Sequence, residues 1–125
     1  MNGFFTIGVG AACGAWLRWG LSPLLNTCLP QFPLGTLVTN LLGGLLMGLV
    51  LGWMHSVEQF PVELRLLLTT GFLGGLTTFS AFSAESFGLL MRHQYFWAAI
   101  HTVSHVLGAL FFTAAGFYLM LSLKH

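Results

Sequence analysis

Charged residues are scarce in this chain, and their scarcity excludes several kinds of protein. Only 6% of the 125 residues are charged, whereas soluble domains carry roughly 25% charged residues. A soluble domain needs a polar shell, which four Lys or Arg and three Asp or Glu do not supply. The formal net charge of +1 provides no basic patch, so we expect no nucleic-acid partner.

Cysteine is also scarce. Cys13 lies in an apolar run and Cys28 in a connection, with a spacing that fits neither a metal site nor a disulfide framework, and we interpret both as structural. A cleavable signal peptide is not evident either. The first apolar run is long, has no basic residues before it and continues past Arg18. We therefore expect it to be retained as a membrane span.

Hydrophobic residues make up 56% of the chain and fall into four long runs. A bilayer core of about 30 Å requires ~20 apolar residues per helix. Prolines and polar residues separate runs at roughly 3–24, 33–54, 64–91 and 96–122. We predict an all-α membrane protein, a single transmembrane domain of four helices surrounded by lipid. Because the connections are short, its function must depend on polar groups inside the membrane.

The basic residues do not favour one orientation of the four helices. Arg65 and Lys124 lie toward the side of the termini, and Arg18 and Arg92 lie toward the other side. Orientation follows an excess of Lys and Arg in cytoplasmic connections. With no excess, two copies can insert in opposite senses and pair about an axis in the membrane plane. We expect a dual-topology antiparallel homodimer, with a single fixed orientation as the alternative.

The second run carries small and polar residues at every fourth position, so they share one helix face. They are Thr36, Asn40, Gly44, Gly48 and Gly52. Small residues let helix backbones approach closely in lipid, so the glycines predict a packing surface. The amide of Asn40 lies near the bilayer centre and must find a partner there. It either makes one interhelical hydrogen bond or offers its NH₂ group to a passing anion.

The third run contains three glycines followed by four hydroxyl residues between Gly71 and Ser83, a composition that disfavours a continuous helix. We predict a third helix that is broken near the bilayer centre, between Gly74 and Thr78. A break leaves carbonyl oxygens that can bind a cation, and the half-helix after it directs N–H groups and a positive dipole toward an anion. The alternative is a kink that serves only helix crossing.

Phe79 and Phe82 lie three residues apart on one face, beside Ser80. The edges of aromatic rings are positive, so they can solvate an anion without holding it too tightly to release. Phenylalanine in a membrane chain is more commonly core or lipid-facing. The pair is therefore weak evidence by itself.

The fourth run places His101 and His105 on one face by their spacing of four residues. Two histidines on a helix can ligate a metal, but no third ligand accompanies them in the sequence pattern, which favours a polar track instead. Glu85, one turn past Phe82, lines a vestibule, caps a polar network or carries protons. Arg18 either attracts anions to a pore mouth or pairs with loop carbonyls or Glu85.

Three segments together resemble the CrcB/Fluc family of bacterial fluoride channels, and the resemblance covers essentially the whole chain. They are GAWLRW at 14–19, PLGTLVTNLLG at 33–43 and TGFLGGLTTFSAFSAE at 70–85. The resemblance implies an antiparallel homodimer in the bacterial inner membrane, with two pores that passively export fluoride and so protect against its toxicity. It also implies a structural sodium ion on the dimer axis.

The resemblance assigns roles to individual residues. The sodium ligands would be the backbone carbonyls of Gly74 and Thr77, and Arg18 would be the basic residue of the family's first helix. From the residues themselves we expect Arg18 and Glu85 at the pore mouth or vestibule. The fluoride pore is lined by Thr36, Asn40, Phe79, Ser80, Phe82 and His105. A polar track along the fourth helix aligns with His101, His105 and Ala109, where the alanine departs from the hydroxyl often found in the family.

Other functions fit the sequence less well. A small proton-coupled exporter of cationic drugs needs a carboxylate in the membrane, and Glu85 is the only candidate but lies toward one end of its helix. A structural subunit would use the glycine stripe but not a broken polar helix. No nucleophile and base pair suggests an enzyme.

Overall fold

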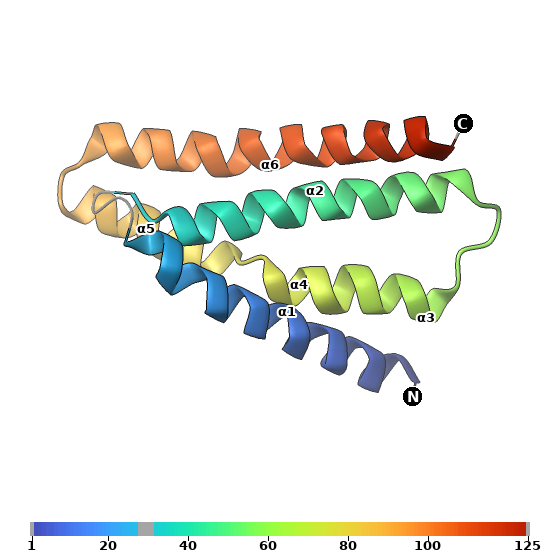
Figure 1. The fold of residues 1–125 in the computed structure, drawn as a ribbon. Helices are drawn as coiled ribbons and strands as arrows, with labels where there is room; N and C mark the ends of the chain where they lie inside the picture. Colours follow the sequence, from blue (N-terminus) through green and yellow to red (C-terminus); the bar gives the residue numbers. More distant parts are fainter. Residues whose placement is uncertain (1, 28–31, 125) are drawn as a thin grey trace.

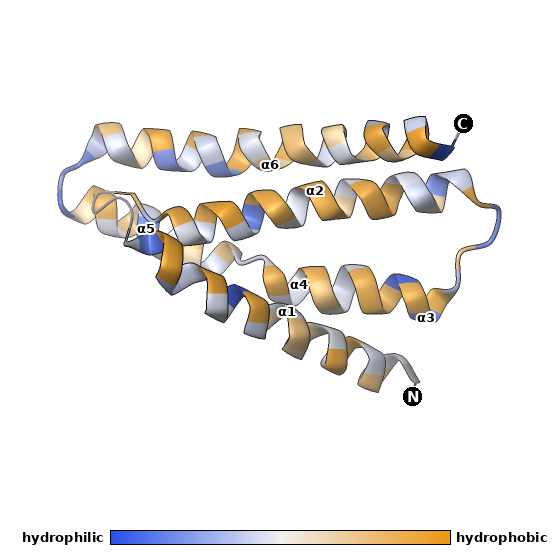
Figure 2. Ribbon diagram, viewed as in Figure 1, coloured by the Kyte–Doolittle hydropathy of each residue, from blue (hydrophilic) through white to orange (hydrophobic). Residues whose placement is uncertain are grey.

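The computed structural model describes residues 2–27 and 32–124, and every secondary-structure element in these ranges is helical. This confirms the predicted all-α class. Cys28 and Pro30 of the first connection lie outside the described residues. Three helical segments are long and apolar enough to cross a membrane, Leu34–Ser56, Val62–Met91 and Tyr95–Lys124. The chain is therefore a multi-pass membrane protein, and Figure 2 shows mostly hydrophobic helices with isolated hydrophilic positions.

The helices form an up-and-down bundle (Figure 1). In chain order they are α1 (Asn2–Asn26), α2 (Leu34–Ser56), α3 (Val62–Arg65), the π-helical segment η1 (Leu66–Leu73), α4 (Gly74–Leu76), α5 (Phe79–Met91) and α6 (Tyr95–Lys124). The described parts of both termini lie at one end of the bundle, together with the connection between α2 and α3. Helices α2 and α6 run side by side in the same direction. The segment from α3 to α5, which separates them in the sequence, brings the chain back to the end where α2 began.

The glycines bring helix backbones together, as the stripe on the second run predicts. A Cβ at Gly44 would lie 3.0 Å from the carbonyl oxygen of Ala109, and a Cβ at Gly48 would overlap that of Thr113. On the other side of the bundle, a Cβ at Gly10 would lie 2.8 Å from the carbonyl oxygen of Leu67. A Cβ at Gly48 or Gly10 would force the facing backbone to shift, and one at Gly44 would be tight, so the predicted close packing is confirmed.

Helix α1 extends beyond its predicted end. The sequence places the end of the first run at residue 24 and treats Pro23 as a breaking residue, whereas α1 continues through Pro23 to Asn26. Proline removes one helical hydrogen bond, a loss that neighbouring helices can compensate in membrane proteins. The Asn26 side chain then receives a hydrogen bond of 2.7 Å from the N–H of Gly35, which ties the start of α2 to the end of α1.

The segment from Val62 to Met91 is not one regular helix. Residues Leu66–Leu73 are π-helical, which the sequence did not indicate. Thr77 and Thr78 have extended backbones, with ψ of 159° and 118°, and separate α4 from α5. Gly74, the first residue of the expected break, is itself helical with φ −63° and ψ −36°. The non-helical backbone therefore covers only Thr77 and Thr78.

Candidate functional site

Asn40 of α2 closes the gap between α4 and α5. Its Oδ1 atom accepts a hydrogen bond of 2.8 Å from the N–H of Thr78, and its Nδ2 donates one of 3.0 Å to the carbonyl oxygen of Thr78. Both polar backbone groups of one extended residue are thus satisfied by a single amide, as buried backbone in a membrane requires. The pair of bonds also fixes which end of the amide is nitrogen.

Two carbonyl oxygens lose their helical donors at this point. In a continuous helix the N–H of Thr78 would bond the carbonyl of Gly74, but it donates to Asn40 instead. Likewise the N–H of Ala81 would bond the carbonyl of Thr77, but it donates to the Thr78 hydroxyl at 3.1 Å. Thr78 is therefore the N-cap of α5, a common role of threonine. The carbonyls of Gly74 and Thr77 do not receive these two helical bonds.

His105 of α6 lies against Asn40 and Phe82. Its Nδ1 atom is 3.1 Å from Nδ2 of Asn40. Because that nitrogen is a donor, the imidazole Nδ1 is the acceptor and the ring proton resides on Nε2. His105 is only 5% exposed, and Nε2 is buried without a hydrogen-bond partner among the described residues. An N–H donor thus remains available inside the protein.

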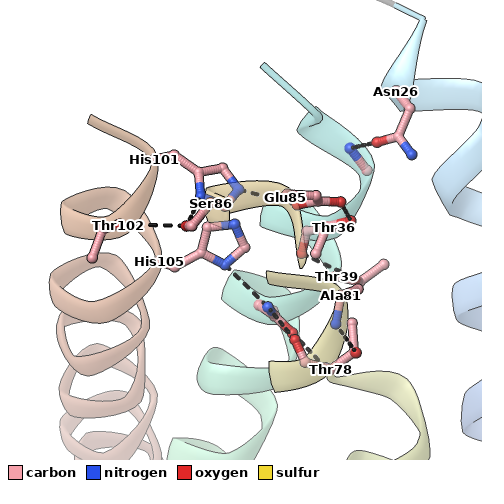
Figure 3. Close-up of polar contacts among 12 residues, drawn as sticks. Asn26, Thr36, Thr39, Thr78, Ala81, Glu85, Ser86, His101, Thr102 and His105 are labelled. Carbon is pink, nitrogen blue, oxygen red and sulfur yellow. Dashed lines mark hydrogen bonds and ion pairs between the residues drawn. The ribbon is translucent and has the colours of Figure 1, made fainter. Parts of the chain in front are cut away.

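Glu85 connects α2, α5 and α6 through a second polar group (Figure 3). One carboxylate oxygen accepts a hydrogen bond of 2.5 Å from the Thr36 hydroxyl, and the other lies 3.0 Å from Nε2 of His101. His101 is fully buried, and its Nδ1 lies 2.7 Å from the hydroxyl of Ser86. Every nitrogen of His101 and both oxygens of Glu85 therefore have partners, which makes this burial tolerable.

The aromatic pair joins this polar region to an open cavity. Phe82 is 8% exposed and stacks on His101, with ring centroids 5.3 Å apart and planes 13° apart. Phe79 contacts Phe82 at a centroid distance of 5.4 Å but is 77% exposed. Both rings line a cavity of about 390 Å³, whose wall also contains Asn40, His105, Gly74, Thr77 and Thr78. Two phenylalanine rings, an amide and an imidazole thus line one space.

Three further residues considered in the sequence lie in or near this region. Arg18 donates from Nε to the carbonyl oxygen of Gly75 at 3.2 Å, so it pairs with a carbonyl near the break, and no bond to Glu85 is present in the described residues. Ser80 is exposed, and its hydroxyl is 3.4 Å from that of Thr78. Ala109, where the fourth helix departs from the expected hydroxyl, lines the cavity.

Thr78 and Ser86 are site residues that sequence reasoning did not assign. A threonine one residue before a helix is a recognisable N-cap, so Thr78 carried a local signal. Ser86 carried none, because its role depends on α6 packing against α5. The sequence pattern also contained no third ligand beside the histidines, whereas the fold places Glu85 next to both.

Comparison with known proteins places this arrangement in a family. The protein family described as "CrcB-like protein, Camphor Resistance (CrcB)" matches residues 5–117. The chain belongs to this CrcB family. A protein of Aromatoleum aromaticum is 54% identical over 91% of this chain and 87% of its own length. One of Thiobacillus denitrificans is 47% identical over 99% of this chain and all of its own. Both are named "Fluoride-specific ion channel FluC", a transporter rather than an enzyme.

Proposed function

We propose that this chain forms a channel that passively exports fluoride across the bacterial inner membrane, protecting the cell against fluoride toxicity. The observation that carries the proposal is the cavity beside the helix break, where an amide, an imidazole and two phenylalanine rings meet. The names of the relatives supply the ion. The names of the relatives and the weak hydrogen-bond donors that line the cavity support the same function.

The cavity offers the kind of solvation that a small anion needs. A pore must replace the lost water with many modest contacts, so that the ion can both enter and leave. The positive ring edges of Phe79 and Phe82 and the hydroxyl of Ser80 are contacts of this strength. So is the Nε2–H of His105, which has no hydrogen-bond partner in the described part of the chain. The N-terminus of α5, a helix of 13 residues, adds a positive dipole.

The pore-facing role of the Asn40 amide takes a different form from the sequence expectation. Its NH₂ group has two hydrogens, one engaged by the carbonyl of Thr78 and one by Nδ1 of His105. Asn40 therefore acts on the anion indirectly, because it orients the backbone at the helix break and the ring of His105. Thr36 similarly reaches the pathway through Glu85, at the vestibule end.

The complete channel is an antiparallel dual-topology homodimer with four spans per chain and two pores. α1 supplies the fourth span, and an even number of spans agrees with the location of both termini at one end in Figure 1. The balanced basic residues support opposite insertion. Phe79 is exposed in the single chain, which suits a pore that takes parts from both copies.

A structural sodium ion fits the chemistry of the helix break. The carbonyls of Gly74 and Thr77 lack the helical bonds from Thr78 and Ala81, and carbonyl oxygens are suitable ligands for a hard cation. Two copies meeting on a two-fold axis would present four such oxygens. The ion would hold the break and the dimer together and would stabilise the assembly by mass action.

Ion release from liposomes tests the proposal. Purified protein is reconstituted into vesicles loaded with fluoride or chloride, with and without a proton gradient. We expect fluoride to leave down its own gradient at a rate independent of the proton and sodium gradients. Absence of fluoride release would refute the channel function. Release that requires a proton gradient would instead favour an exporter that uses Glu85, and flux that reverses with the sodium gradient would refute the structural role of sodium.

A further inference from the structure

Three potential metal ligands meet where α5 and α6 pack together. One ligand atom from each of Glu85, His101 and His105 lies within 4.8 Å of the other two. The histidines lie one turn apart on α6, and their ring centroids are 4.5 Å apart. Figure 3 shows both rings beside Glu85. The fold thus provides the third ligand that the spacing of the two histidines lacked.

The ligand types match the preferences of one class of cation. Two imidazole nitrogens and one carboxylate oxygen form a set that binds Zn²⁺ and leaves a fourth position for water. Tetrahedral ligand atoms about 2 Å from Zn²⁺ lie about 3.3 Å from one another, so a pair separated by 4.8 Å must close by about 1.5 Å.

The surroundings of the histidines also favour a ligand. Nε2 of His105 is buried without a partner among the described residues, although His105 is only 5% exposed. Ligation through Nε2 would leave the proton of His101 on Nδ1, which lies 2.7 Å from the Ser86 hydroxyl. That hydroxyl can accept this proton's hydrogen bond, as the outer partners of metal-bound histidines do.

We propose that Glu85, His101 and His105 bind a zinc-class divalent cation and that the bound cation blocks anion passage. Binding of the metal is independent of the proposed function, whereas the block rests on it. The site is formed by groups around Phe82, which stacks on His101 and lines the cavity. The cation with one carboxylate ligand leaves a fixed net positive charge there, which holds an anion instead of releasing it, and conduction requires release.

Asn40 opposes metal binding through the proton of His105. Its amide is held by both backbone groups of Thr78, so it presents a donor to Nδ1 of His105 and keeps the ring proton on Nε2. Ligation at Nε2 moves that proton to Nδ1, where it faces another donor. Aspartate at this position would accept the proton, and such carboxylate partners change metal affinity by about 10–100-fold. We expect Asn40→Asp to bind zinc more tightly than the wild type.

Calorimetric titration of zinc chloride into the purified full-length protein tests the site. The protein carries no histidine tag, and the background bears His55→Gln and His93→Gln, which remove two exposed histidines. We expect one zinc ion per chain, with affinity at least tenfold weaker in His101→Gln, His105→Gln and Glu85→Gln. Unchanged affinity in the two α6 variants, or loss of binding in the background alone, would overturn the proposal.

Two further measurements remain decisive if a variant fails to fold. Cobalt added to the background protein should give the strong visible absorption of four-coordinate Co²⁺, and a spectrum of the aqueous ion alone would overturn the site. Zinc should slow fluoride release from liposomes at the concentration that saturates calorimetric binding. Fluoride release unaffected by saturating zinc would overturn the block. A protein that binds zinc without ever releasing fluoride would instead contradict the proposed function.

Discussion

The contact between α2 and α6 differs between its two halves. Toward the C-terminal ends of both helices it is a close backbone contact, because Gly48 and Gly116 allow each backbone to touch the other. Toward the N-terminal ends it is polar, and Asn40 and His105 meet by a hydrogen bond. The same two helices therefore pack by two mechanisms within one bundle.

The difference separates stability from function. In lipid, close backbone contact through small residues stabilises helix pairs by van der Waals packing. Polar side chains in the membrane are costly, and they are retained where an ion or substrate passes. We expect the glycine half to act as the scaffold and the polar half as the pathway. Substitutions in each half should then affect different measurements.

The largest expected effect is that of Asn40→Asp. The change replaces two N–H donors with carboxylate oxygen, which repels both the Thr78 carbonyl and an approaching anion. Charged hydrogen bonds are worth about 1.5–3 kcal/mol, so fluoride release from liposomes holding equal amounts of dimer should fall by well over tenfold. The matched control is Asn26→Asp, which keeps the oxygen that accepts from Gly35. Wild-type fluoride flux in Asn40→Asp would mean that this amide contributes only to helix packing.

The next largest effect is expected from the aromatic pair. Phe82→Ile and Phe79→Ile keep apolar bulk but remove the ring edges, each worth about 0.5–1.5 kcal/mol. Initial fluoride release should fall at least tenfold, or about 1.4 kcal/mol, while dimer content stays near wild type. Methionine should be milder because its thioether is polarizable. The control is Phe87→Ile, because Phe87 lies on the same helix and is 62% exposed. Wild-type rates in both Phe79→Ile and Phe82→Ile would mean that these rings contribute only to packing.

Gly48→Ala should sharpen the comparison from the other half. Its Cβ would overlap the Thr113 carbonyl, so the helices must separate at a cost of about 1–3 kcal/mol. We expect a lower midpoint of thermal denaturation in detergent but nearly unchanged flux per folded dimer. Gly20→Ala serves as the control, since nothing lies within 4 Å of a Cβ there. A flux defect without a stability defect would contradict the division of the contact.

The smallest effect is expected from Ser80→Ala. The Ser80 hydroxyl is exposed and makes only a long contact of 3.4 Å with the Thr78 hydroxyl. Loss of one modest donor, about 0.5–1 kcal/mol, should slow fluoride release about two- to fivefold. Ser80→Thr keeps the hydroxyl and should restore most of the rate. If threonine fails where alanine is tolerated, side-chain volume rather than the hydroxyl is decisive.

Particular residues show how far the sequence can be interpreted. The spacing of Gly44 and Gly48 predicted that both would lie close to a neighbouring helix, because small residues at every fourth position share a face. The π-helical segment Leu66–Leu73 gave no signal, since its composition is that of an ordinary apolar helix. Nor did Pro23 end α1, because tertiary contacts override a single helix-breaking residue.

The sequence by itself determined the membrane environment and the helical class, because both follow from apolar runs that no tertiary contact can change. It also marked the hydroxyl and glycine residues around the break. Only the tertiary structure decided which groups meet there. Asn40 and Thr78 are 38 residues apart, and Glu85 and His101 are 16 apart. Whether such groups meet depends on how helices pack and rotate, which is set by the sum of many contacts rather than by local sequence.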